Sequence, residues 1–260
     1  MSLPIGTALK DGFAKTASRA GAILIAAYLV VNGVYLVSVM STIRAYAAQN
    51  GAPMTGATGL ALDLPLSVAG ALLALSGVLL LYLPIVTIRT FVADERQSVR
   101  SEHLTGGVLF ALLNLVVGGI VYGIAVFIGL VLLVVPGVFL MVALAFMQVF
   151  IVVEGDNFVA AMRKSWRLTE GDRFALFALG AVIVGLSFAL WIVLTIGSFV
   201  VAFAGISQAV LSVAQLVITI PVSLYTLAVL ASAFNLLRGD AGDLDGGEST
   251  TTPDTPSTPA

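Results

Sequence analysis

The sequence contains no cysteine, a single histidine and few charged residues. Without cysteine, the chain cannot form disulfides or thiolate metal sites, and it has no cysteine nucleophile. Since His103 stands alone, the sequence predicts no histidine-based metal centre. Only 10% of the residues are charged, whereas soluble proteins carry roughly 25%. Too few charged side chains are therefore present to cover the surface of a soluble fold.

Apolar residues fill the space that these absences leave, since 59% of the chain is hydrophobic. A membrane-spanning helix needs about 20 consecutive apolar residues. Four segments exceed that length without any Lys, Arg, Asp or Glu: 20–43, 64–88, 103–153 and 174–237. The composition therefore predicts an all-α, polytopic membrane protein.

The two longest segments each have room for two spans. Pro136 and Gly137 form a turn signal within the third segment, and Gly205 lies in a short polar break of the fourth. The sequence thus predicts six transmembrane helices in a domain covering 20–238. Their expected ranges are 20–43, 64–88, 105–133, 137–153, 174–200 and 209–236.

The basic residues indicate the orientation of these spans. With the N-terminus in the cytoplasm, every lysine and arginine except Arg44 falls on the cytoplasmic side. Cytoplasmic loops carry an excess of such residues. We therefore expect a multi-pass protein of the cell membrane with both termini in the cytoplasm. A slightly basic body is normal for such a protein and implies no nucleic acid.

Residues outside the spans form two amphipathic segments and a tail. Segment 1–19 is expected to be a cytoplasmic amphipathic helix, with Phe13 on its apolar stripe and Lys15 on the opposite, charged face. It aligns weakly with the second segment at an offset of 153 residues, which would mean a parallel repeat. Residues 239–260 are rich in Asp, Ser, Thr and Pro and are expected to be disordered.

The second amphipathic segment, 157–170, holds the candidate binding residues. Its apolar positions recur at helical spacing, and its basic residues lie on the other face. Such a helix anchors at the headgroup level, which is the simpler interpretation, or it docks a soluble cytoplasmic protein. The candidate residues for lipid or partner binding are Arg163, Lys164, Trp166, Arg167 and Arg173.

The spans show no sign of catalysis or of ion coupling. Membrane enzymes and ion-driven carriers keep ionisable residues within the bilayer, and none of these spans has an Asp, Glu, Lys or Arg near its middle. We therefore expect no enzyme activity, no cofactor and no metal. Two hypotheses remain open: a non-catalytic membrane protein acting through 157–170, and a permease or membrane subunit of an ATP-driven transporter. The oligomeric state is left undetermined.

One combination of motifs resembles a known family. Residues 135–137 hold a Val-Pro-Gly turn, 152–156 an acidic exit from a span, and 160–173 the stretch AAMRKSWRLTEGDR. Together they resemble uncharacterised six-helix proteins that are similar to the membrane domain of glycerophosphodiester phosphodiesterases, of the free-standing type found in haloarchaea. The resemblance implies a fold and a membrane location. It transfers no catalytic residue, because the phosphodiesterase activity belongs to a separate soluble domain.

Overall fold

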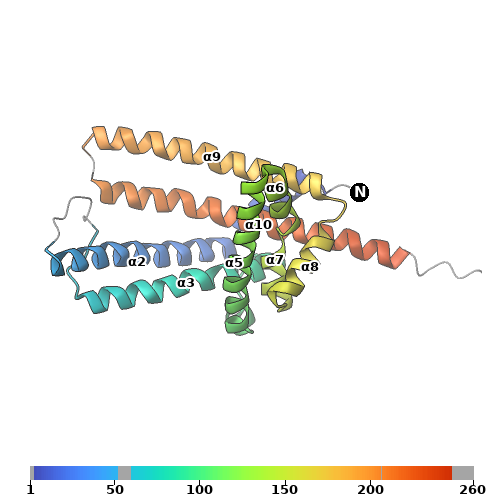
Figure 1. Ribbon diagram of the computed structural model, residues 1–260, viewed down its shortest axis with the longest axis horizontal. Helices are drawn as coiled ribbons and strands as arrows, with labels where there is room; N and C mark the ends of the chain where they lie inside the picture. The colour runs from blue at the N-terminus through green and yellow to red at the C-terminus, as the bar shows by residue number, and fades with distance from the viewer. Residues whose placement is uncertain (1–2, 52–59, 206, 248–260) are drawn as a thin grey trace, which may run out of the picture.

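The computed structural model describes residues 3–51, 60–205 and 207–247, and this part of the chain is helical without a strand (Figure 1). Six helical segments are long and apolar enough to span a membrane, as the composition predicts. They are α2 (Arg19–Gln49), α3 (Leu66–Val92), α5 (Val108–Leu132), the segment from α6 (Val134–Ala143) through α7 (Met147–Val149) to the π-helix η1 (Phe150–Glu154), α9 (Arg173–Phe203) and α10 (Gln208–Gly247). Three shorter helices, α1 (Ile5–Thr16), α4 (Ser101–Thr105) and α8 (Phe158–Leu168), connect or flank them.

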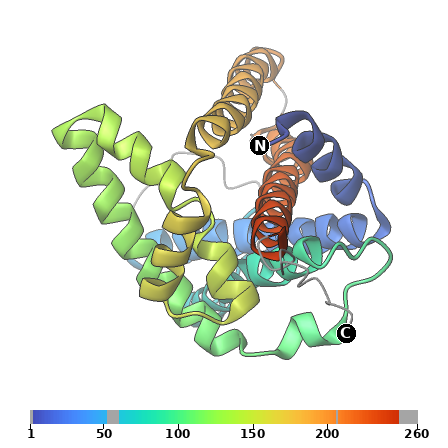
Figure 2. The same ribbon diagram turned by 90° about the vertical axis from the view of Figure 1, so that its right-hand side faces the viewer.

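The six apolar segments do not all run in one direction. Helices α2, α3, α9 and α10 lie along the longest axis of the molecule and form a bundle in which α10 packs against the other three. The α5–α6 hairpin runs across these four helices, near one end of the bundle (Figure 1). The view along the bundle shows the same hairpin extending to one side of it (Figure 2).

We call the end of the bundle near the hairpin the basic end. Helices α2 and α9 begin there, and α3 ends there. Direct hydrogen bonds hold its segments together. The Ala20 amide donates to the Arg96 carbonyl at 3.0 Å, and the Asn235 side chain donates to the Val92 carbonyl at 2.9 Å. At the opposite, far end lies Arg44, the one basic residue assigned to the outside, 3.9 Å from Asp63.

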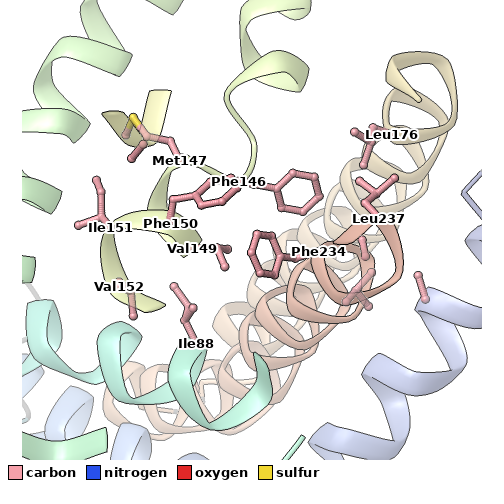
Figure 3. Packing of buried hydrophobic residues seen from close by; sticks show 14 of the residues in the cluster. Ile88, Phe146, Met147, Val149, Phe150, Ile151, Val152, Leu176, Phe234 and Leu237 are labelled. Atoms are coloured by element: carbon pink, nitrogen blue, oxygen red, sulfur yellow. The ribbon is translucent and has the colours of Figure 1, made fainter. Parts of the chain in front are cut away.

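The largest core cluster is also at the basic end. Phe234 of α10 packs against the rings of Phe146 and Phe150, with centroid distances of 5.8 and 5.2 Å (Figure 3). Ile88 of α3 and Leu176 of α9 join the same cluster. Toward the far end the long helices expose apolar side chains, as lipid-facing helices do.

The helix at the N-terminus, α1, packs differently from the prediction. Lys15 was expected on its solvated face and Phe13 on its buried stripe. In the structure Lys15 is buried, with 2% of its surface exposed, while 68% of Phe13 is exposed. The reason is close packing: Gly12 lies so near Val229 of α10 that a Cβ atom there would be 2.5 Å from the valine Cγ2. The face bearing Ala8, Gly12 and Lys15 therefore turns inward.

Neighbouring groups compensate the buried charge of Lys15. Its ammonium lies 3.3 Å from Asp11 and 3.6 Å from Asp94, and it donates to the Phe91 carbonyl at 2.8 Å. Partial burial acts to raise the pKa of Asp11, but hydrogen bonding from Ser232 and the charge of Lys15 outweigh it and lower that pKa. These contacts tie α1 to α10 and to the end of α3.

The predicted fourth span, 137–153, is not one continuous α-helix. Helix α6 ends at Ala143, and α7 and η1 follow after a short break. Ser165 of α8 stabilises this break, because its hydroxyl donates to the Ala143 carbonyl at 2.9 Å and accepts from the Phe146 amide at 3.2 Å. Thr169 also donates to the Ala143 carbonyl, at 3.4 Å. Side chains from a later helix thus satisfy backbone groups that the break exposes.

The last helix extends beyond its predicted end. Helix α10 continues through Gly239, where the disordered tail was expected to begin, to Gly247, while 248–260 lie outside the described residues. Adding residues to an established helix costs far less than starting one, and the packed segment up to Leu237 provides that start.

Candidate functional site

The candidate site is built on α8, whose start is fixed by two asparagines. Asn157 caps the helix by accepting from the Ala160 amide at 2.9 Å. Asn114 of α5 accepts from the Phe158 amide at 3.0 Å. Because two of the four amides that the start of a helix leaves free have side-chain partners, the start of α8 is fixed against α5.

The two faces of α8 match the predicted pattern in part. Ser165 and Thr169 of the predicted stripe are fully buried together with Ala161, and the basic side chains on the opposite face are exposed. Trp166, which the same spacing placed on the apolar face, is 39% exposed. Those basic residues do not form one site, however. They separate into a shallow acidic–basic region near η1 and an apolar pocket beside α9.

Lys164 belongs to the region near η1. Its ammonium lies 2.6 Å from Glu154 and 2.7 Å from Asp156, and hydrogen bonds to Asp156 and then Glu154 raise its pKa. Arg238 of α10 lies 3.1 Å from Glu154. Arg167 lines a pocket of about 420 Å³ with Glu154, Lys164 and Arg238. Two carboxylates therefore already neutralise much of the positive charge on this side.

Arg173 and Trp166 come together on the other side of α8. The guanidinium carbon of Arg173 lies 4.8 Å from the centroid of the Trp166 ring and 4.8 Å from that of Phe139 in α6. The two rings meet edge to face at 5.3 Å. This cation–π arrangement holds the charged head in an apolar setting.

The contacts of Arg173 leave part of its hydrogen-bonding capacity unused. One terminal nitrogen donates to the Trp166 carbonyl at 3.4 Å. Its Nε is buried and has no hydrogen-bond partner among the described residues. Unpaired buried donors are rare in folded proteins, which makes this nitrogen a candidate contact for an anion.

An apolar pocket of about 640 Å³ opens beside Arg173. Val134, Val135, Val138 and Val142 of α6 line one wall, with Phe174 and Phe177 of α9 on the other. A pocket with a cation at its rim and aliphatic walls suits an amphipathic molecule.

The structure thus brings together only some of the five predicted residues. Trp166 and Arg173 meet, Lys164 and Arg167 share the other pocket, and Arg163 is exposed and lines neither. Sequence reasoning missed Phe139, because a phenylalanine within an apolar segment resembles any other core residue. Only its contact with Arg173, far away in the sequence, makes it part of the site.

A second cluster was also missed. Glu95, Glu102 and His103 place one ligand atom each within 4.8 Å of one another, a grouping that can hold a metal ion. Arg100, however, lies 2.5 Å from Glu95 and 3.1 Å from Glu102. Since this guanidinium occupies the carboxylates that a metal would need, the cluster acts first as an ion-pair network.

A known family model matches the chain along nearly its whole helical part. The description of that family is "Domain of unknown function (DUF7847)", and the match covers residues 3–237. No curated protein and no solved structure matches the chain. The similarity to the membrane domain of glycerophosphodiester phosphodiesterases therefore stays a prediction.

Proposed function

The chain belongs to this family of unknown function, and we propose that it is a non-catalytic membrane protein that binds a phospholipid between α6, α8 and α9. The proposal is carried by Arg173. Its guanidinium lies 4.8 Å from the centroids of two aromatic rings, with Nε buried and unpaired among the described residues. A lipid phosphate is an anion that an arginine binds well, through charge-assisted hydrogen bonds.

The pocket beside Arg173 suits the rest of such a ligand. Its walls are aliphatic and aromatic, and it lies against the first two turns of α9, where that apolar helix begins. A phospholipid with its phosphate at Arg173 would lay an acyl chain along Val138 and Phe177. Burial of apolar surface then adds to the electrostatic attraction.

The charge of α8 supports the same assignment. Arg167 is exposed on α8, and basic residues near the cytoplasmic leaflet attract anionic lipid. In this proposal the basic end faces the cytoplasm, and α8 lies at the surface of the cell membrane. The resemblance to a domain that accompanies lipid-related hydrolases fits a lipid-binding role without implying hydrolysis.

The test compares two arginine variants that lose the same charge. The protein is purified in mild detergent, and bound phospholipid is quantified by mass spectrometry for the wild type, Arg173→Ala and Arg163→Ala. We expect about one phospholipid per chain in the wild type and in Arg163→Ala. In Arg173→Ala we expect retention to fall about tenfold, because the charge-assisted contact is lost.

Two results would contradict the proposal. Equal lipid retention in both variants would remove the role of Arg173. An ATPase that co-purifies in a fixed ratio would instead favour the membrane subunit of an ATP-driven transporter, with α8 as its docking helix.

A further inference from the structure

The α5–α6 hairpin has a turn that is chemically unlike the loops at the far end of the bundle. From Gly123 to Met147 the sequence contains no polar or ionisable side chain. The residues of the turn itself, Leu132, Leu133, Val134 and Val135, are between 66% and 78% exposed. The far-end loops contain polar residues such as Asn50 and Ser207. A turn that projected into water would not consist of exposed leucine and valine.

The position of the turn also sets it apart from the far-end loops, because the turn lies at the basic end. Val134 and Val135 line a pocket together with Arg173, Phe174 and Phe177, which form the start of α9 at the basic end. Helix α9 has 31 residues and therefore rises about 46 Å from there to its far end. A hairpin that crossed the membrane alongside α9 would place its turn near Phe203 instead.

Both ends of the hairpin are also held at the basic end. Asn114 of α5 accepts from the Phe158 amide, and Arg89, near the end of α3, donates to the Val152 carbonyl at 2.9 Å. Close to the turn, α5 and α6 touch through glycines, since a Cβ at Gly129 would lie 2.8 Å from the Gly137 Cα. The hairpin is therefore a compact unit whose base and tip lie at the same end of the bundle (Figures 1 and 2).

The order of the helices marks this hairpin as separate from the others. The short helices α1 and α8 begin 153 residues apart, at Ile5 and Phe158. The long helices that follow them, α2 and α9, begin 154 residues apart, at Arg19 and Arg173, and each has 31 residues. In each half, a short helix with a buried alanine, Ala8 or Ala161, precedes the long helices of the bundle. The α5–α6 hairpin lies between these two similar units.

We infer that the α5–α6 hairpin does not cross the membrane but lies within the leaflet at the basic end. Its apolar surface contacts the acyl chains of that leaflet, and the chain crosses the bilayer four times, through α2, α3, α9 and α10. The turn lies close to the headgroups, where water can reach the carbonyls that the end of α5 leaves unpaired. This inference rests on the turn and not on lipid binding by Arg173.

Single-cysteine variants provide the test, because the chain has no cysteine of its own. Leu133→Cys marks the turn, and the exposed positions Asn50→Cys and Glu170→Cys mark the far and basic ends. In sealed vesicles, a membrane-impermeant maleimide should label the two markers from opposite sides. We expect no labelling of Leu133→Cys from the side that labels Asn50→Cys, and labelling from that side would overturn the inference.

Lipid could shield the cysteine at position 133 from the reagent on either side of the membrane. A distance measurement in lipid nanodiscs therefore tests the position of the turn independently of labelling. Spin labels are placed on Leu133→Cys together with either Phe174→Cys or Phe203→Cys, whose native side chains are about nine-tenths exposed. We expect the distance from Leu133 to Phe174 to be much the shorter of the two. A shorter distance from Leu133 to Phe203 would mean that the hairpin crosses the bilayer.

Discussion

The buried Lys15 provides the most direct test of how α1 is held. Replacing Lys15 with alanine removes two ion pairs, to Asp11 at 3.3 Å and Asp94 at 3.6 Å, and a hydrogen bond to the Phe91 carbonyl. Breaking a buried ion pair costs about 3–5 kcal/mol. The side chains of Asp11 and Asp94 are 32% and 52% exposed, so water screens the carboxylates that remain, and we lower the expected loss to about 2–3 kcal/mol.

Lys10 is the matched control, because it lies on the same helix and is exposed. Lys10→Ala should change the free energy of unfolding by less than about 0.5 kcal/mol. Thermal unfolding in detergent, followed by circular dichroism, should show Lys15→Ala melting roughly 5–10 °C below Lys10→Ala. Equal melting temperatures would refute the reasoning. In a double-mutant cycle, Asp11→Asn should cost less in the Lys15→Ala background than in the wild type.

Two further predictions concern the same region. Gly12→Ala should destabilise the protein by about 1–2 kcal/mol, because the added Cβ would clash with Val229. Gly6→Ala should stabilise it by up to about 1 kcal/mol, because a Cβ at Gly6 meets nothing within 4 Å and alanine favours the helix. Urea unfolding should therefore show changes of opposite sign for the two variants. The second concerns pH. Since burial is outweighed by the Ser232 hydrogen bond and the Lys15 charge, the pKa of Asp11 lies below its usual 3.8. Its contribution to stability is therefore present above pH 3.8 and lost as the pH falls through the lowered pKa. The difference in melting temperature between wild type and Asp11→Asn should shrink below pH 3.8, and a constant difference would contradict the assigned shift.

The sequence is sufficient to predict the helices themselves. Apolar runs uninterrupted by charge indicate α2, α3, α5, α9 and α10 to within a few residues of their start, because a backbone in lipid must satisfy its hydrogen bonds within the helix. The two faces of α8 follow equally well from its 3.6-residue period. These features depend on local sequence alone.

Other features depend on contacts between distant residues, and the sequence cannot reveal them. The break after Ala143 exists because Ser165 and Thr169 can bond to its carbonyl. Likewise, the burial of Lys15 follows from the small Gly12 beside Val229 and from Asp94, which lies on another segment. Periodicity places a lysine on the polar face of a helix, but it cannot show that this face meets two carboxylates.

A pattern of small residues in α5 shows the same limit. Gly119 and Gly123 form a GxxxG pattern that is typical of close helix packing. A Cβ on either residue would meet nothing within 4 Å, whereas one at Gly118 would lie 2.8 Å from the Phe158 Cβ. The pattern identifies a helix that can pack closely, but the neighbouring glycine makes the contact. Which glycine is used depends on where α8 lies.

Counting spans from hydropathy has a related weakness. The six apolar segments were oriented by their basic residues, yet no lysine or arginine lies between Arg100 and Arg163. Both ends of the α5–α6 hairpin therefore lie on the same side whether it crosses twice or not at all, and the charge rule is satisfied equally. Hydropathy measures how strongly a helix prefers lipid, but it does not give the direction of that helix in the bilayer. The position of the turn beside Arg173 favours four crossings over six, which is why the turn should be labelled first.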